Sequence, residues 1–230
     1  RSGAAHSWHN VADVSLCLGD LEMTHSYATE ALRLTQETGL RRVEVTSLLL
    51  LGHVAFYRGQ PEEALSYVAQ AAVLNDQLQL SFATLLSAFL KGQALAALEQ
   101  WEAAEQAYAR SAAVEGDFAF LKLYCEAGIG LVHLAQGELA ALRPLADKIV
   151  VHLEEQGPGY YREPLWLPWT AYQFLTALND KRADTILAAA RNLLTTLTQR
   201  ISSEEERQLF LQKIPTHRAL CQLIELPSTS

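Results

Sequence analysis

Cysteine is scarce in this sequence. Only three of the 230 residues are cysteines, Cys17, Cys125 and Cys221, and no two of them form a Cys-x-x-Cys pair. An odd number of widely spaced cysteines excludes a disulfide framework and supplies no ligand set for structural zinc. Such cysteines are typical of small core residues in a reducing compartment, so we expect a cytoplasmic protein.

Glycine, proline and basic residues are also few. The 12 Gly and 7 Pro are too few for the many turns of an all-β protein. Lys and Arg number 18 against 26 Asp and Glu, for a net charge of -8. A protein that neutralises many phosphates needs a basic face, so we expect no direct nucleic-acid partner. The most apolar run, Val45–Tyr57, is short and interrupted by polar residues, and it predicts no membrane span.

Hydrophobic residues, by contrast, make up 50% of the chain, and the helix formers Leu, Ala, Glu and Gln are abundant. This composition predicts a well-packed helical core rather than a disordered chain. The first residues, RSGAAHSWHN, lack a methionine and a secretory leader and enter a helical pattern directly. We therefore expect a piece of a longer protein.

Small residues recur with a fixed spacing. Three pairs of markers lie 40 residues apart: Gly19 and Gly59, Gly52 and Gly92, Ala64 and Ala104. A constant period of this length is the signature of stacked helical hairpins. Each unit has a first helix with a small residue in mid-course, at Ala12, Gly52, Gly92 and Gly130. A tight turn follows, centred on Gly19, Gly59, Glu99 and Gly137.

The stretch GQPEEAL, residues 59–65, begins the second helix of its unit rather than a ligand loop. Pro61 stands at the helix start, where its missing N–H is harmless, and Glu62 and Glu63 suit the first turn. The fold class that follows is all-α, a superhelix of about five hairpins. The hairpins span approximately residues 4–39, 41–79, 80–115, 118–156 and 163–200.

The fifth unit and the tail depart from the pattern. The loop EQGPGYYREP before the fifth unit is the only Gly/Pro cluster and predicts a bend or a subdomain boundary. Its adjacent Tyr160 and Tyr161 are candidates for a mobile arm over a binding groove, and a structural role is the alternative for at least one of them. Two short helices over residues 201–226, with Ser203 and Glu206 at capping-box spacing, are expected to cover the last open apolar face.

The markers together resemble the tetratricopeptide repeat (TPR). They are Trp8, Ala12, Gly19, Ala28 and Ala31, then Leu51, Gly52, Gly59, Ala64 and Ala71, then Gly92, Trp101, Ala104 and Tyr108. The period of 40 residues exceeds the usual 34 and resembles the TPR-like arrays of large bacterial signalling ATPases and maltose-activator-like transcription regulators. The tail is similar to the end segment of those proteins at Ile201, Arg207, Phe210, Leu211, Pro215 and Arg218.

The resemblance implies a right-handed superhelix, and a non-catalytic sensing or docking module within a larger regulator, beside neighbouring domains of the same polypeptide. It also implies that the first helix of each hairpin lines an inner, concave groove, suited to a protein, a peptide or a small-molecule effector. Aromatic residues at helical spacing also fill cores, and core packing stays an alternative for each member. The candidate binding residues are His9, Asp13, His53, Phe56, Tyr57, Phe89, Gln93, Tyr124, Trp166, Trp169 and Gln173.

Other classes of function have less support in the sequence. His6, His9 and Asp13 share one helix face, but a structural zinc site needs a fourth ligand. Cys125 and His133 are two turns apart, too far for activation of a thiolate. No phosphate-binding loop is present, and we expect no enzyme and no cofactor. The alternative to partner binding is an oligomerisation segment that self-associates through its end repeats.

The register makes a mutational prediction. Gly52→Leu should disrupt hairpin packing and clearly lower the melting temperature, because only a small residue permits the close helix approach expected there. Gln60→Ala, in the turn, should leave the melting temperature almost unchanged. Thermal unfolding followed by circular dichroism measures both, and equal effects of the two changes would contradict the register.

Overall fold

A computed structural model describes residues 2–159 and 162–225 of the chain. Within these ranges the chain forms twelve α-helices and two short 3₁₀ helices, and no strand. The all-α prediction is therefore confirmed. The chain divides into two compact units, residues 1–16 with 21–132, and residues 17–20 with 133–230. Tyr160 and Tyr161, predicted as an arm, lie outside the described residues.

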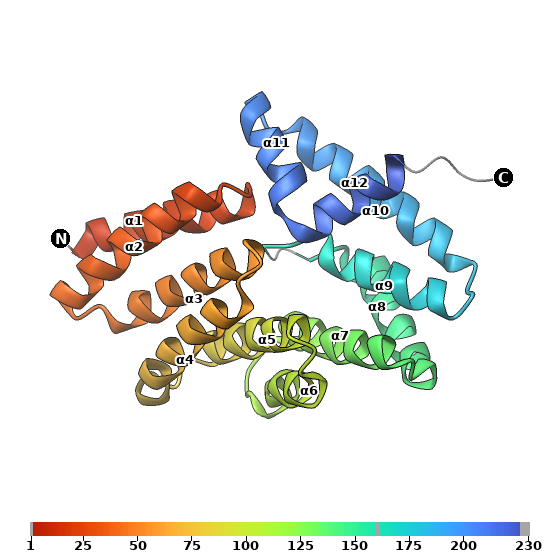
Figure 1. Ribbon diagram of the computed structural model, residues 1–230, viewed down its shortest axis with the longest axis horizontal. Coiled ribbons are helices and arrows are strands. Elements are labelled where there is room, and N and C mark those ends of the chain that lie inside the picture. The colour runs from red at the N-terminus through yellow and green to blue at the C-terminus, as the bar shows by residue number, and fades with distance from the viewer. Residues whose placement is uncertain (1, 160–161, 226–230) are drawn as a thin grey trace. The chain divides into compact units, whose positions relative to one another are not determined.

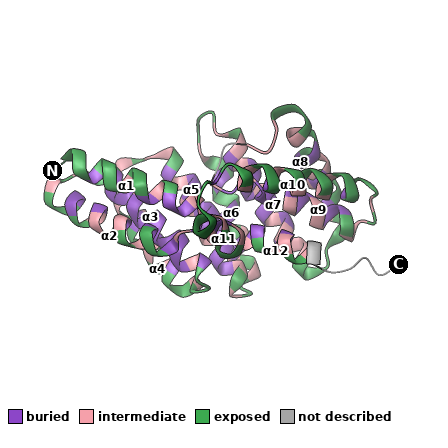
Figure 2. Cartoon of the chain, turned by 90° about the horizontal axis from the view of Figure 1, so that it is seen from above, coloured by how far each residue is buried: buried purple, intermediate pink, exposed green. Residues whose placement is uncertain are grey.

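Consecutive antiparallel helices build the first unit, as the left part of Figure 1 shows for α3 and α4. α3 packs against α2, α4 and α5, and it is buried along almost its whole length (Figure 2). The last helix of this unit, α7, continues into the second unit. The elements are α1 (Ser2–Cys17), α2 (Leu21–Thr38), α3 (Arg41–Tyr57), α4 (Pro61–Leu78), α5 (Ser81–Ala97), α6 (Trp101–Ala109), η1 (Arg110–Ala113) and α7 (Ala119–Gln136).

The second unit continues with shorter and less regular elements. These are η2 (Leu139–Ala141), α8 (Leu142–Gln156), α9 (Trp166–Ala177), α10 (Arg182–Gln199), α11 (Glu204–Lys213) and α12 (Pro215–Glu225). α9 packs against α8 and α10, and α11 packs against α12. Ser203 caps α11 as its sequence predicts, since its Oγ accepts the Glu206 N–H at 3.3 Å.

One turn geometry closes four of the hairpins. At Gly59 the backbone is left-handed, with φ +76°, and the next N–H, that of Gln60, donates to the Ala55 carbonyl at 2.9 Å. This is the hydrogen-bond pattern of a helix C-terminus with a left-handed residue after it. The same geometry recurs at Glu99, Gly137 and Asn179. The fifth turn has Asn179 in place of glycine, since asparagine also adopts the left-handed conformation readily.

Close helix approach occurs where the register places small residues. A Cβ added to Gly52 would lie 2.9 Å from Leu90 Cδ2 and 3.4 Å from Tyr67 Cβ. The tightest contact belongs to the Tyr108 ring, which lies between Gly92 and Gly128. Added Cβ atoms there would lie 2.4 Å and 2.5 Å from the ring. In the fourth unit, therefore, the ring of Tyr108 meets Gly128 on α7, and the Gly130 that the sequence indicated is also buried on that helix.

Buried hydrogen bonds hold the C-terminal helices within the second unit. The Thr216 hydroxyl donates to Glu163 Oε2 at 3.0 Å, and both residues are buried. His217 Nδ1 lies 2.9 Å from the Phe210 carbonyl. Burial lowers the pKa of His217 to about 4, so its imidazole is neutral at pH 7.

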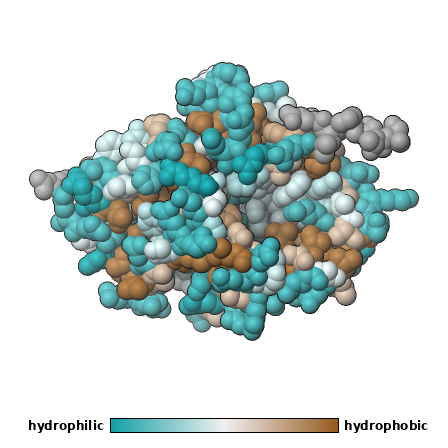
Figure 3. Space-filling model, in the orientation of Figure 1, coloured by the Kyte–Doolittle hydropathy of each residue, from teal (hydrophilic) through white to brown (hydrophobic). Residues whose placement is uncertain are grey.

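On the face in Figure 3, hydrophilic side chains predominate, and apolar side chains gather over α4 and α5. Among the described helices, none combines the length and the apolar character needed to cross a membrane.

The contact of Tyr108 with two glycines can be tested by mutation. Gly92→Ala should lower the free energy of unfolding by about 2 kcal/mol, because the new methyl group overlaps the ring. In a Tyr108→Leu background the further loss on adding Gly92→Ala should fall below about 1 kcal/mol. Urea unfolding of the four members of this cycle measures the coupling. Gly3→Ala is the matched control, since nothing lies within 4 Å of that added carbon. Additive effects of the two changes would contradict the contact.

Candidate functional site

The predicted binding residues are distributed over the first helix of each hairpin. In the first unit, α1 carries His9 and Asp13, α3 carries His53, Phe56 and Tyr57, α5 carries Phe89 and Gln93, and α7 carries Tyr124. In the second unit, α9 carries Trp166, Trp169 and Gln173. We call these residues the first-helix set.

The set divides by burial. Five members are half-buried: His9, Asp13, Phe56, Trp169 and Gln173. The other six are buried. Among these, Phe89 packs edge-on against Tyr124, with ring centroids 5.6 Å apart, and Tyr124 is 0% exposed. This pair fills the interior of the first unit in the described structure, whereas the half-buried members keep surface that a partner can reach.

Several members meet directly on α3 and near it. The Tyr57 ring lies 6.2 Å from the rings of both His53 and Phe56. Phe56 also packs on a cluster of the small residues Ala55, Ala64 and Ala94. His9 Nδ1 on α1 lies 3.2 Å from the Ser47 hydroxyl on α3. In the second unit, the rings of Trp169 and Tyr172 pack at a tilt, with centroids 5.5 Å apart.

A polar residue recurs at one register position of four of the five first helices. Asp13, His53, Gln93 and Gln173 each stand six residues before the left-handed residue of the following turn, where the fourth unit has Leu131. A repeated packing position in an apolar helix normally carries an apolar side chain, so four polar residues indicate another requirement. Gln93 Oε1 is buried and has no hydrogen-bond partner among the described residues. His133 stands only four residues before its turn and does not share this position, and its Nδ1 lies 2.6 Å from Glu138 Oε2.

The thiol of Cys125 is not activated as a nucleophile. Burial raises the pKa of this thiol to about 12, so it is protonated at neutral pH. On α1, His6 is exposed and its Nδ1 lies 3.0 Å from the Ser2 carbonyl. Within residues 2–159 and 162–225, no three His, Cys, Asp or Glu side chains lie close enough to hold a metal ion.

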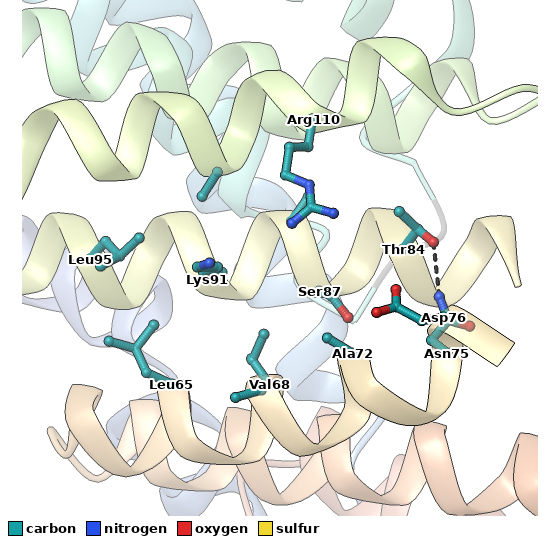
Figure 4. Close-up of a pocket in the computed structure, with 13 residues that line it drawn as sticks. Leu65, Val68, Ala72, Asn75, Asp76, Thr84, Ser87, Lys91, Leu95 and Arg110 are labelled. Atoms are coloured by element: carbon teal, nitrogen blue, oxygen red, sulfur yellow. Dashed lines mark hydrogen bonds between the residues drawn. The ribbon is translucent and has the colours of Figure 1, made fainter. Parts of the chain in front are cut away.

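The structure reveals a groove that the sequence did not predict. It has a volume of about 260 Å³ and lies between α4, α5, α6 and η1 (Figure 4). Leu65, Val68 and Leu95 form an apolar end. At the other end Asn75 Nδ2 donates to Thr84 Oγ1 at 2.9 Å. Between these ends, Ser87 Oγ is shielded from solvent and has no hydrogen-bond partner among the described residues. We call this cavity the α4–α5 groove.

The repeat itself explains why a cavity opens here. Three alanines line the groove where residues 40 positions earlier are much larger. The substituted pairs are Ala72 for Leu32, Ala88 for Leu48, and Ala107 for Tyr67. Loss of side-chain volume at a repeated packing position leaves space that backbone relaxation does not fill. The sequence signal for the groove is therefore the smaller side-chain size at these positions than at the equivalent positions of the preceding unit.

A second cavity, of about 300 Å³, lies within the second unit among α8, α9 and α10. Its lining is mostly apolar and includes Leu153, Pro168, Ile186 and Leu193. A lining without convergent polar groups does not specify a ligand.

Comparison with known proteins supports the fold. No protein-family model matches the chain, and no curated protein matches it by sequence. Among solved structures it is similar to a Rap protein complexed with competence and sporulation factor, with a TM-score of 0.68 and 16% identity. The match covers 97% of this chain and 65% of the Rap chain, so this chain spans less than two thirds of that protein.

It is also similar to a kinesin light chain from Podosopora anserina with nearly identical TPR-like repeats. Two such structures each give a TM-score of 0.56 and 15% identity. They cover 84% and 87% of this chain, and 96% and 99% of the kinesin chains. Together with the helical hairpins, these neighbours establish a TPR-like repeat fold.

Proposed function

We propose that this chain is a non-catalytic binding module, which recognises a protein, a peptide or a small effector through the first-helix set. The observation that carries the proposal is the polar residue at one register position of four first helices, beside half-buried aromatic side chains such as Phe56 and Trp169. TPR-like repeats generally mediate protein–protein interaction, and the Rap neighbour was solved with a bound factor.

The finer assignment is a sensing or docking array of a bacterial signalling or transcription regulator in the cytoplasm. It is supported by the 40-residue period and by the spacing of Arg207, Phe210, Pro215 and Arg218 in the tail. Binding would shift the packing of neighbouring hairpins, because each unit of a repeat array contacts chiefly its neighbours. Flanking domains of the same polypeptide would receive that change.

A peptide selected from a displayed library on the immobilised chain provides a probe for this surface. Phe56→Ala, in the first unit, or Trp169→Ala, in the second, should weaken binding of that peptide at least about tenfold, because buried aromatic anchors dominate such interfaces. Fluorescence polarisation measures the affinity, and circular dichroism verifies that each variant is folded. Val73→Ala on α4, which removes an exposed apolar side chain elsewhere, is the control. Unchanged affinity in both aromatic variants would refute binding through the first-helix set.

Self-association is a second candidate function, favoured by exposed apolar residues on α1. Trp8, Val11 and Val14 are 36%, 43% and 61% exposed and form the α1 stripe. Much of the surface of α1 is exposed in Figure 2. At the positions equivalent to Trp8 and Val11, α3 has Leu48 and Leu51, and both are only 3% exposed. The face that packs in later units is thus uncovered on α1, and a second copy of the chain fits its apolar chemistry.

Sedimentation velocity over a range of protein concentrations tests self-association. The unmodified chain should sediment faster as its concentration rises, because association follows mass action. The double variant Val11→Lys/Val14→Lys should sediment as a monomer throughout, since buried unpaired charges oppose the interface. Val73→Lys, at a side chain that is 65% exposed on α4, should behave like the unmodified chain. A concentration-independent value for the unmodified chain would refute this candidate.

A further inference from the structure

The charged residues of the α4–α5 groove lack partners of their own. Lys91 on α5 and Arg110 on η1 both line the cavity. Among the described residues, neither cation has a carboxylate within 4.0 Å. In a chain with 26 acidic and 18 basic residues, two such cations at one cavity form an uncommon local excess of positive charge. An anionic group in the groove would find both of them within the same lining.

The preceding unit has uncharged residues at the positions equivalent to Lys91 and Arg110. At the positions 40 residues earlier the chain has Leu51 and Gln70. Leu51 is 3% exposed, so the repeat position of Lys91 is an ordinary packing position in the preceding unit. The preceding Ser47 also has a neighbour, His9 Nδ1 at 3.2 Å, whereas its equivalent Ser87 has none among the described residues. Thus the cavity, the cations and the unpartnered hydroxyl all occur in the same unit.

The lining also orients a ligand. In Figure 4, Arg110 points from η1 toward the centre of the groove, where Ser87 lies. Asp76 lies at the end occupied by Asn75 and Thr84, and its carboxylate would repel an anion placed there. The opposite end is apolar. An anionic head beside Arg110 and Lys91, with an apolar body toward Leu65 and Leu95, matches the charge and the apolar surface of the lining.

We propose that the α4–α5 groove binds a small free carboxylate with an apolar body, as an effector site distinct from the first-helix set. The Arg110 guanidinium and the Lys91 ammonium hold the carboxylate. The volume of about 260 Å³ suits a compact organic acid. It exceeds the roughly 150 Å³ of a cavity that accepts benzene and is below the range of most drug-sized ligands.

Titration calorimetry with octanoate as the probe tests this proposal on the whole chain. Octanoate should bind at least about tenfold more tightly than 1-octanol, because the alcohol has the same apolar body and no charge. Acetate, which has the charge and almost no apolar body, should bind at least tenfold more weakly than octanoate. Equal affinity for octanoate and octanol would overturn the proposal, as would failure of octanoate to bind.

Substitutions that introduce the residues of the preceding unit test whether octanoate binds in the α4–α5 groove. Lys91→Leu and Arg110→Gln introduce the residues of the equivalent positions, and each should lower octanoate affinity at least about tenfold while leaving octanol affinity unchanged. Ala88→Leu should abolish binding of both compounds by filling the cavity. Ala72→Leu provides the same test if Ala88→Leu unfolds, because Leu32 occupies its equivalent position. Octanoate affinity that is unchanged in a folded cavity-filled variant would overturn the assignment. The library peptide should bind these variants normally, which separates this site from the first-helix set.

Discussion

The packing of Tyr108 against two glycines is the contact on which the first unit depends most. Its ring lies between Gly92 on α5 and Gly128 on α7, closer than any Cβ would allow. Three helices therefore share one side chain, which is 2% exposed and also meets Phe89. Because interiors are packed nearly as densely as crystals, such a ring fixes the spacing of the helices around it. The burial of Phe89 and Tyr124 follows from that spacing.

The fold could be predicted from the sequence because the repeat period and the residue types in the turns depend on local backbone conformation. Gly59, Glu99 and Gly137 occupy equivalent turns, and their left-handed conformation depends only on neighbouring residues. Asn179 completes the series without a glycine. The contact at Gly128 could not be predicted, because it depends on where the Tyr108 ring on the preceding α-helix points.

The candidate sites were predicted less completely, for a related reason. Position on a first helix identifies a face, but burial depends on how far the neighbouring helices approach. Phe56 and Phe89 look alike in sequence, yet Phe56 is half-buried and Phe89 is 2% exposed. The α4–α5 groove arises from missing volume at Ala72, Ala88 and Ala107, and no motif marks missing volume. The repeat thus keeps its backbone while differences in side-chain size create sites in individual units.

The identical turns at Gly59 and Glu99 also bear on how such a chain can change in length. Residues 60–99 form one full period, so a deletion of this segment would join one left-handed turn directly to the start of α6. The helix before that turn would then be α3, with Gly52 at the place of Gly92. Tyr108 would again meet a glycine on the preceding helix. Recombination between units can therefore shorten or extend the array while a matching partner for the ring is kept.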